Sequence, residues 1–151
     1  MAKVEIYTDG AAKGNPGNGG YGAVLLSGAY KKELSGGFRL TTNNRMELLA
    51  VIVALEQLKK ARTEVTIYSD SKYVVDAVEK GWVFNWQKTN FKNKKNVDLW
   101  KRFLEVYANH QVNFVWVKGH AGNFYNERCD ELAVEAAEGR ELKEDEGYAS
   151  T

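Results

Sequence analysis

The order of strand-like and helix-like segments constrains the fold of this chain most strongly. Three segments with strand patterning come first, and helices then alternate with two further strands. The predicted strands are residues 4–8, 21–27, 32–41, 64–69 and 112–117, and the predicted helices are 44–60, 72–80, 97–109 and 126–138. A turn joins the second strand to the third, and we expect the first three strands to pair antiparallel with their neighbours. The sequence therefore predicts an α/β fold in which helices cover both faces of a mixed five-stranded sheet.

A glycine-rich segment at residues 10–22 is predicted to be a loop. It contains a G-x-G-x-x-G match at Gly17, Gly19 and Gly22. A dinucleotide-binding fingerprint must open a helix, whereas this match runs into a predicted strand. We therefore discard a dinucleotide-binding enzyme.

One domain accounts for the patterned part of the chain. Its 151 residues suffice for a single core, which we expect to span residues 1–138. Residues 139–151 are acidic and lack periodicity, so we expect a frayed tail. The N-terminus lacks a signal-peptide pattern, and no apolar run approaches the roughly 18 residues of a membrane span. Because the single cysteine, Cys129, also suits a reducing compartment, we expect a cytoplasmic monomer without a membrane partner.

The charges are divided unevenly along the chain, although the net charge is only +1. Residues 88–102 carry six bases and one acid, whereas residues 127–146 carry nine acids and three bases. Such a division is typical of a protein with a local polyanion-binding surface, but it also fits two solvated faces of opposite sign. Charge alone leaves both interpretations open.

Four carboxylates lie where predicted strands end or predicted helices begin. Taken singly, Asp9 could belong to a turn, and Asp130 could interact favourably with the dipole at the start of the last predicted helix. Glu47 and Asp70 could each cap a helix. Taken together, strand ends would bring the acids to one edge of the sheet, where they would repel each other without a cation. Oxygen ligands without thiolates select Mg²⁺ or Mn²⁺, so the four predict a two-metal site for phosphoryl chemistry.

The two histidines and two of the tryptophans have different predicted roles. His120, in the segment KGHAGN, is either a proton carrier at the mouth of this site or a solvated ring. His110 follows a predicted helix and is interpreted as a cation at its C-terminus. Trp100 and Trp116 are expected in the core.

Five segments along the chain carry recognisable motifs, namely VEIYTDGAAKGNPGNGGYGA, TTNNRMELLAVIVALE, YSDSKYV, NVDLW and WVKGHAGNFYNERCDELA. In this order they resemble the motifs of the bacterial type 1 ribonuclease H family. This resemblance covers nearly the whole chain. It implies an endonuclease that hydrolyses the RNA strand of RNA–DNA hybrids by two-metal-ion catalysis, leaving 5′-phosphate and 3′-hydroxyl ends. The family's metal ligands match Asp9, Glu47, Asp70 and Asp130, and its loop histidine, which assists proton transfer or product release, matches His120.

The resemblance also implies a set of substrate contacts. Asn15, Asn43 and Asn44 match residues that read the RNA minor groove and its 2′-hydroxyls. Thr42 and Asn96 match a pocket for a DNA-strand phosphate. The remaining matches border the DNA channel or form a basic protrusion that binds phosphates: Tyr73, Trp82, Trp86, Lys88, Lys92, Lys94 and Lys95.

Some positions depart from the family pattern. The loop of the basic protrusion is shorter, Lys72 stands where a glutamine is frequent, and residues 123–125 replace a proline-bearing loop. These departures bear on affinity and cleavage preference rather than on the reaction. Two rival functions remain: a DNA nuclease with the same acidic site, and a hybrid-binding module without catalysis. The asparagines argue against the first, and the intact set of acids argues against the second.

Overall fold

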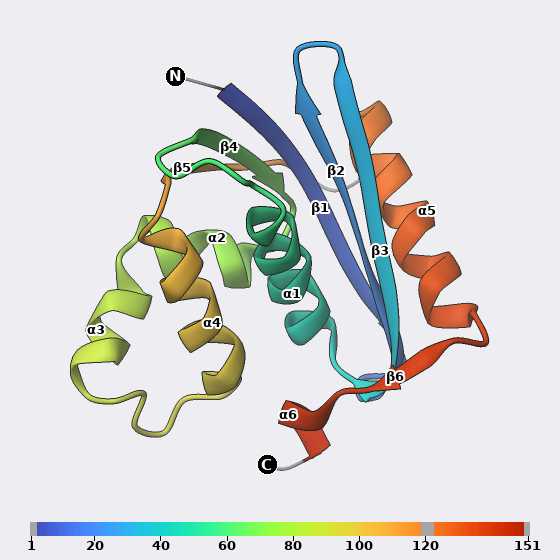
Figure 1. The fold of residues 1–151 in the computed structure, drawn as a ribbon. Helices are drawn as coiled ribbons and strands as arrows, with labels where there is room; N and C mark the ends of the chain where they lie inside the picture. The colour runs from blue at the N-terminus through green and yellow to red at the C-terminus, as the bar shows by residue number, and fades with distance from the viewer. Residues whose placement is uncertain (1–2, 119–122, 150–151) are drawn as a thin grey trace.

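The computed structural model describes residues 3–118 and 123–149 (Figure 1). Its strands are β1 (Lys3–Lys13), β2 (Gly17–Ser27), β3 (Tyr30–Thr41), β4 (Glu64–Ser69), β5 (Gln111–Trp116) and β6 (Leu142–Glu144). Its helices are α1 (Asn43–Glu56), α2 (Lys72–Glu79), α3 (Trp82–Lys88), α4 (Val97–Tyr107), α5 (Phe124–Glu138) and α6 (Glu146–Ala149). The order of the elements agrees with the predicted order, to which the structure adds α3, β6 and α6.

The strands form one mixed sheet in the order β5-β4-β1-β2-β3-β6. As predicted, β1, β2 and β3 pair antiparallel. β4 runs parallel to β1, and β5 runs parallel to β4. The predicted α/β class is confirmed, but the predicted count of five strands is wrong by one because β6 pairs with β3 at the far edge.

Helices cover both faces of this sheet (Figure 1). Alternate residues of a strand face opposite sides. Ile6 of β1 therefore lies in the core beneath α1, whereas Tyr7 packs near Cys129 beneath α5. From residue 45 to residue 55, α1 is buried on nearly every side, and only Glu47 and Val53 in this stretch are half-buried, in keeping with its apolar run at residues 48–55. Among the described residues, no helix combines the length and apolarity needed to cross a membrane.

The glycine-rich segment at residues 10–22 is not a loop, and that expectation is wrong. Only residues 14–16 lie between β1 and β2, so most of the segment is strand. A Cβ atom added at Gly20 or at Gly22 would collide with backbone oxygen atoms of α5. These glycines therefore let a helix lie directly on the sheet, which is one of the reasons for glycine inside a strand.

The C-terminal segment, residues 139–151, is structured over its described part, contrary to the expected frayed tail. β6 pairs in parallel with β3, and α6 follows it (Figure 1). Asp145, between these two elements, is buried and accepts hydrogen bonds from Thr41 at 2.6 Å and from Arg45 at 2.7 Å. Periodicity could not reveal this, because β6 has only three residues and Arg45 lies 100 positions away in the sequence.

Candidate metal centre and its surroundings

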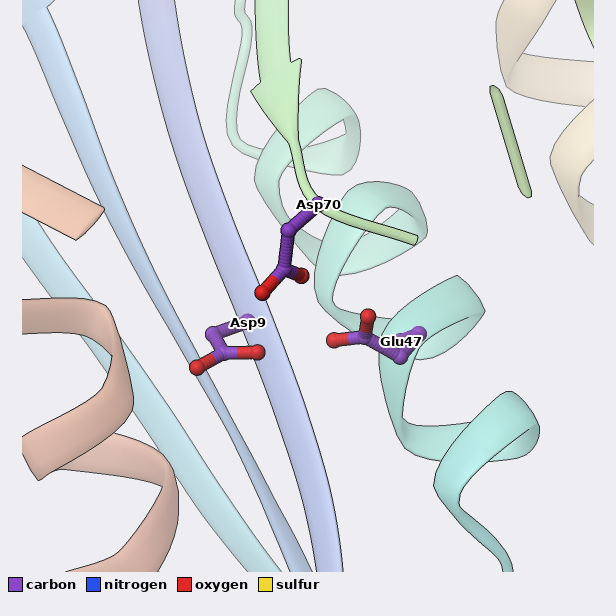
Figure 2. A group of neighbouring side chains, drawn as sticks. All are labelled: Asp9, Glu47 and Asp70. Carbon is purple, nitrogen blue, oxygen red and sulfur yellow. The ribbon is translucent and has the colours of Figure 1, made fainter. Parts of the chain in front are cut away.

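Three carboxylates meet at one edge of the central strands, as Figure 2 shows. Asp9 lies in β1, Asp70 directly follows β4, and Glu47 lies near the start of α1. One carboxylate oxygen from each lies within 4.8 Å of the others. The parallel pairing of β1 with β4 brings Asp9 and Asp70 to the same edge, and α1 crosses that edge with Glu47.

The local explanations for these acids do not hold in the structure. Asp9 lies inside β1 rather than in a turn. Thr42 is the N-cap of α1, where its hydroxyl accepts a backbone N–H at 3.2 Å, so Glu47 does not serve this purpose. Ser71 caps α2 in the same way, in place of Asp70. Neither helix capping nor turn formation therefore explains why these three side chains converge.

Asp130 lies on α5, at the wall of the same site. It is half-buried and stands outside the tight group of three acids. All four acids line one cavity of about 400 Å³. The structure thus brings three of the four predicted metal ligands together and places the fourth beside them.

The electrostatics of this cluster favour a bound cation. Burial of Glu47, followed by the negative charges of Asp9 and Asp70, raises the pKa of the Glu47 carboxyl well above its usual value. A divalent cation would remove this penalty by neutralising the acids. The donors are carboxylate oxygens without thiolate, which suits hard cations such as Mg²⁺ and Mn²⁺.

Replacing Glu47 with glutamine should stabilise the metal-free protein at neutral pH. Because the pKa of Glu47 is raised in the folded protein, its carboxyl group favours folding only while it is protonated. This contribution to stability is complete below the unfolded-state pKa of about 4.3 and is lost as the pH rises through the raised folded-state pKa. Glutamine carries no charge and escapes this loss. Each pKa unit corresponds to about 1.4 kcal/mol, and 1 kcal/mol raises Tm by about 2–4 °C in a domain of this size.

Thermal unfolding in a chelator between pH 4 and pH 8 measures this effect. The difference in Tm between Glu47→Gln and the parent should be near zero at the acid end and should grow with pH. Glu105→Gln, at an exposed position of α4, provides the matched control and should follow the parent throughout. A Glu47→Gln curve parallel to that of the parent would show that the carboxylate is not strained at neutral pH.

Two of the predicted substrate residues fix the turn between β1 and β2 against α1. The Asn43 side chain accepts a hydrogen bond from the backbone N–H of Ala12 at 2.6 Å. The Asn15 side chain accepts one from the backbone N–H of Asn43 at 3.1 Å. Asn44, the next residue of α1, is exposed and lines the acidic cavity. Asn43 and Asn44 thus line the acidic cavity, and Asn15 is hydrogen-bonded to the backbone of the first of them.

A larger cavity of about 760 Å³ contains more of the predicted substrate residues. Those that line it are Asn15, Thr42, Asn44, Lys94, Lys95 and Asn96. Within it, the Asn96 amide donates to the Tyr73 hydroxyl at 2.9 Å, and its oxygen accepts from Arg45 at 3.3 Å. Buried Arg45, which the sequence analysis did not single out, therefore orients a pocket residue.

The predicted basic protrusion corresponds to α3 and the loop after it. Trp82 is exposed, whereas Trp86 is half-buried and packs edge-on against Trp100 with 5.9 Å between ring centroids. The ammonium of Lys94 lies 4.9 Å from the Trp86 ring centroid. All four lysines of the segment are exposed: Lys88, Lys92, Lys94 and Lys95.

The predictions for the two histidines and for Trp100 and Trp116 have different outcomes. His120 lies outside the described residues. The Nδ1 atom of His110 accepts a backbone N–H from Thr63 at 3.3 Å, and burial lowers the pKa of this histidine, so its interpretation as a helix-end cation is wrong. Trp100 is fully buried, as predicted. Trp116 is 41% exposed, contrary to prediction, because it ends an edge strand that has no neighbour on its outer side among the described residues.

Comparison with known proteins points to one family. A family model described as RNase H matches residues 1–138. The ribonuclease H of Rippkaea orientalis is 56% identical over 151 residues, which cover 97% of this chain and 92% of that protein. The ribonuclease H of Syntrophus aciditrophicus is 57% identical, with 97% and 87% coverage.

Solved structures agree with this assignment. LC9-RNase H1, a type 1 RNase H with the type 2 active-site motif, superposes with a TM-score of 0.84 at 30% identity, covering 100% of this chain and 82% of that one. LC11-RNase H1 in complex with an RNA/DNA hybrid gives a TM-score of 0.72 at 29% identity, with 89% and 96% coverage. Because sequence and fold agree along nearly the whole chain, this protein belongs to the ribonuclease H family, as its bacterial type 1 motifs predict.

Proposed function

We propose that this protein is a Mg²⁺-dependent endonuclease that hydrolyses the RNA strand of RNA–DNA hybrids. The observation that carries the proposal is the convergence of Asp9, Glu47 and Asp70 within 4.8 Å, with Asp130 on the wall of the same cavity. Membership of the ribonuclease H family supports the substrate, since one structural relative is in complex with an RNA/DNA hybrid.

The four acids are the proposed ligands of two Mg²⁺ ions, for which Mn²⁺ could substitute. When bound, such ions supply an activated water and neutralise the charge that develops on the phosphate and on the leaving oxygen. Asp9, Glu47 and Asp70 already lie within 4.8 Å of one another, so these three ligands need little rearrangement to accept a cation. We assign proton transfer or product release to His120. The products carry 5′-phosphate and 3′-hydroxyl ends.

Substrate recognition is assigned to residues on either side of the acids. Asn15, Asn43 and Asn44 have short amides that both donate and accept, which suits recognition of the 2′-hydroxyls of RNA. Thr42 and Asn96 bind a phosphate of the DNA strand, and Asn96 is already oriented by Tyr73 and Arg45. The DNA strand continues along the aromatic and basic side chains, namely Tyr73, Trp82, Trp86, Lys88, Lys92, Lys94 and Lys95.

The proposed setting is a cytoplasmic monomer with a single catalytic domain. One cysteine in 151 residues supports a reducing compartment. Light scattering of the purified protein, with and without a hybrid, tests the monomer directly, since a dimer would have twice the mass.

Cleavage of strand-labelled nucleic acids tests the proposed reaction. We expect cutting of the RNA strand of a hybrid in Mg²⁺, and no cutting in a chelator or of matched duplex RNA or duplex DNA. Cleavage of duplex DNA would favour the DNA nuclease instead. Metal-independent binding of the hybrid without any cleavage would reduce the protein to a hybrid-binding module.

A further inference from the structure

Lys72 brings a positive charge to the wall of the acidic cavity. It is the first residue of α2, two positions after Asp70, and its side chain is exposed. It is the only basic residue among the described residues that line this cavity, and it shares the cavity with four carboxylates. A phosphodiester entering such a site is repelled by the acids, so a cation at the rim lowers the barrier to its approach.

Trp116 holds this lysine in place. The indole N–H donates to the backbone carbonyl oxygen of Asp70 at 3.2 Å, which fixes the ring against the strand end that carries the acid. Pairing of Trp116 with Ser69 in the β4–β5 ladder fixes its backbone as well. The Lys72 ammonium lies 4.5 Å from the indole ring centroid. The exposed Trp116, at the end of β5, therefore contacts both the backbone of Asp70 and the ammonium of Lys72 at the cavity rim.

A lysine above an aromatic ring remains able to bind an anion. An ammonium has three N–H donors, and the face of one ring occupies only one side of it. A cation–π contact at an exposed site is weak, so it restrains the lysine side chain without binding it strongly. Placement above the indole thus lowers the rotamer entropy that Lys72 would lose on binding a phosphate.

We propose that Lys72 contacts a backbone phosphate of the RNA strand beside the bond that is cut, and that Trp116 is the positioning residue for this contact. This inference rests on the proposed function. It gives a role to the lysine that departs from the glutamine frequent in the family. It also gives a role to Trp116, which is too exposed to be part of the core.

The salt dependence of hybrid cleavage tests the contact. For Lys72→Ala and for Lys72→Gln, kcat/KM at low salt should fall roughly tenfold, mostly through KM, and the slope of log(kcat/KM) against log[salt] should become shallower by about 0.9. Lys72→Arg should retain the parental slope. Lys59→Ala is the matched control, because Lys59 is an exposed lysine beyond the end of α1 opposite to Glu47.

Trp116 variants separate positioning from a general loss of structure. Trp116→Phe keeps a ring but loses the N–H that donates to Asp70, so KM should rise by less than in Trp116→Ala while Tm stays near that of the parent. Adding Trp116→Ala to Lys72→Ala should change the salt slope no further, because both substitutions remove the same contact.

The outcomes distinguish this inference from the proposed function. If the parent cleaves the hybrid and Lys72→Ala retains the full salt slope, Lys72 does not bind a phosphate and the inference is wrong. An unchanged slope with a shifted Mg²⁺ requirement would overturn it as well, since Lys72 would then act on the metal site. If the parent fails to cleave the hybrid, the proposed function itself is wrong.

Discussion

Replacing Asp9 with asparagine should abolish hybrid cleavage while leaving hybrid binding measurable. Asp9 is buried in β1 and directs its carboxylate at Glu47 and Asp70. Asparagine has nearly the same shape but no charge, so the site loses part of its attraction for cations while the strand is retained. Metal ions contribute several kcal/mol to such reactions, and a loss of about 4 kcal/mol corresponds to a decrease in kcat of about 10³-fold.

Single-turnover cleavage and hybrid binding should be measured on the same preparations. Tm of Asp9→Asn in a chelator should be at least that of the parent, because the substitution relieves repulsion among the acids. Asp76→Asn applies the same chemical change to α2, where Asp76 pairs with Lys80 at 3.8 Å, and should cleave at the parental rate. Cleavage by Asp9→Asn near the parental rate in Mg²⁺ would remove Asp9 from the proposed ligands.

The sequence was sufficient to predict the fold class and the meeting of the acids. Periodicity placed Asp9 and Asp70 at the ends of two predicted strands, and parallel strands bring such ends to one edge, although β1 continues past Asp9 to Lys13. Asp9 and Asp70 could therefore be placed together without a structure. Glu47 could be assigned to the same site because it is a charged residue in an otherwise apolar helix. Burial of its carboxylate would be unfavourable without a cation or hydrogen bonds.

The features that the sequence did not predict depend on contacts between distant segments. Gly20 and Gly22 are typical of a loop until α5 is known to lie on them. Trp116 is typical of a core residue until β5 is known to be an edge strand. In each case the local pattern has two interpretations, and only the position of another element decides between them.

The largest effect on stability is expected for Asp145, in the segment that sequence patterning left without structure. Arg45 is 1% exposed, and its guanidinium lies 2.7 Å from carboxylate oxygens of both Asp98 and Asp145. Burial alone would lower the pKa of Arg45, but hydrogen bonds to Asp98 and Asp145 outweigh it and raise that pKa. The charge of Arg45 is therefore retained in the core and depends on both acids.

Asp145→Asn should lower the free energy of unfolding by about 3 kcal/mol, because removing one partner of a buried ion pair costs about 3–5 kcal/mol and Asp98 still offsets part of the charge. The corresponding decrease in Tm is about 6–12 °C. Urea and thermal unfolding of Asp145→Asn and the parent measure it.

Glu144→Gln provides the neighbouring control. Glu144 pairs with Arg39 at 3.3 Å, but both side chains are more than half exposed, so its loss should change stability by less than about 0.5 kcal/mol. Equally small effects of the two substitutions would show that β6 and α6 contribute to stability only as surface elements. A large effect of Asp145→Asn alone would show that the core of the domain is completed by residues beyond position 138, where the match to the family model ends. A chain truncated at residue 138 would then lose at least as much stability as Asp145→Asn, since it lacks both β6 and the carboxylate that neutralises Arg45.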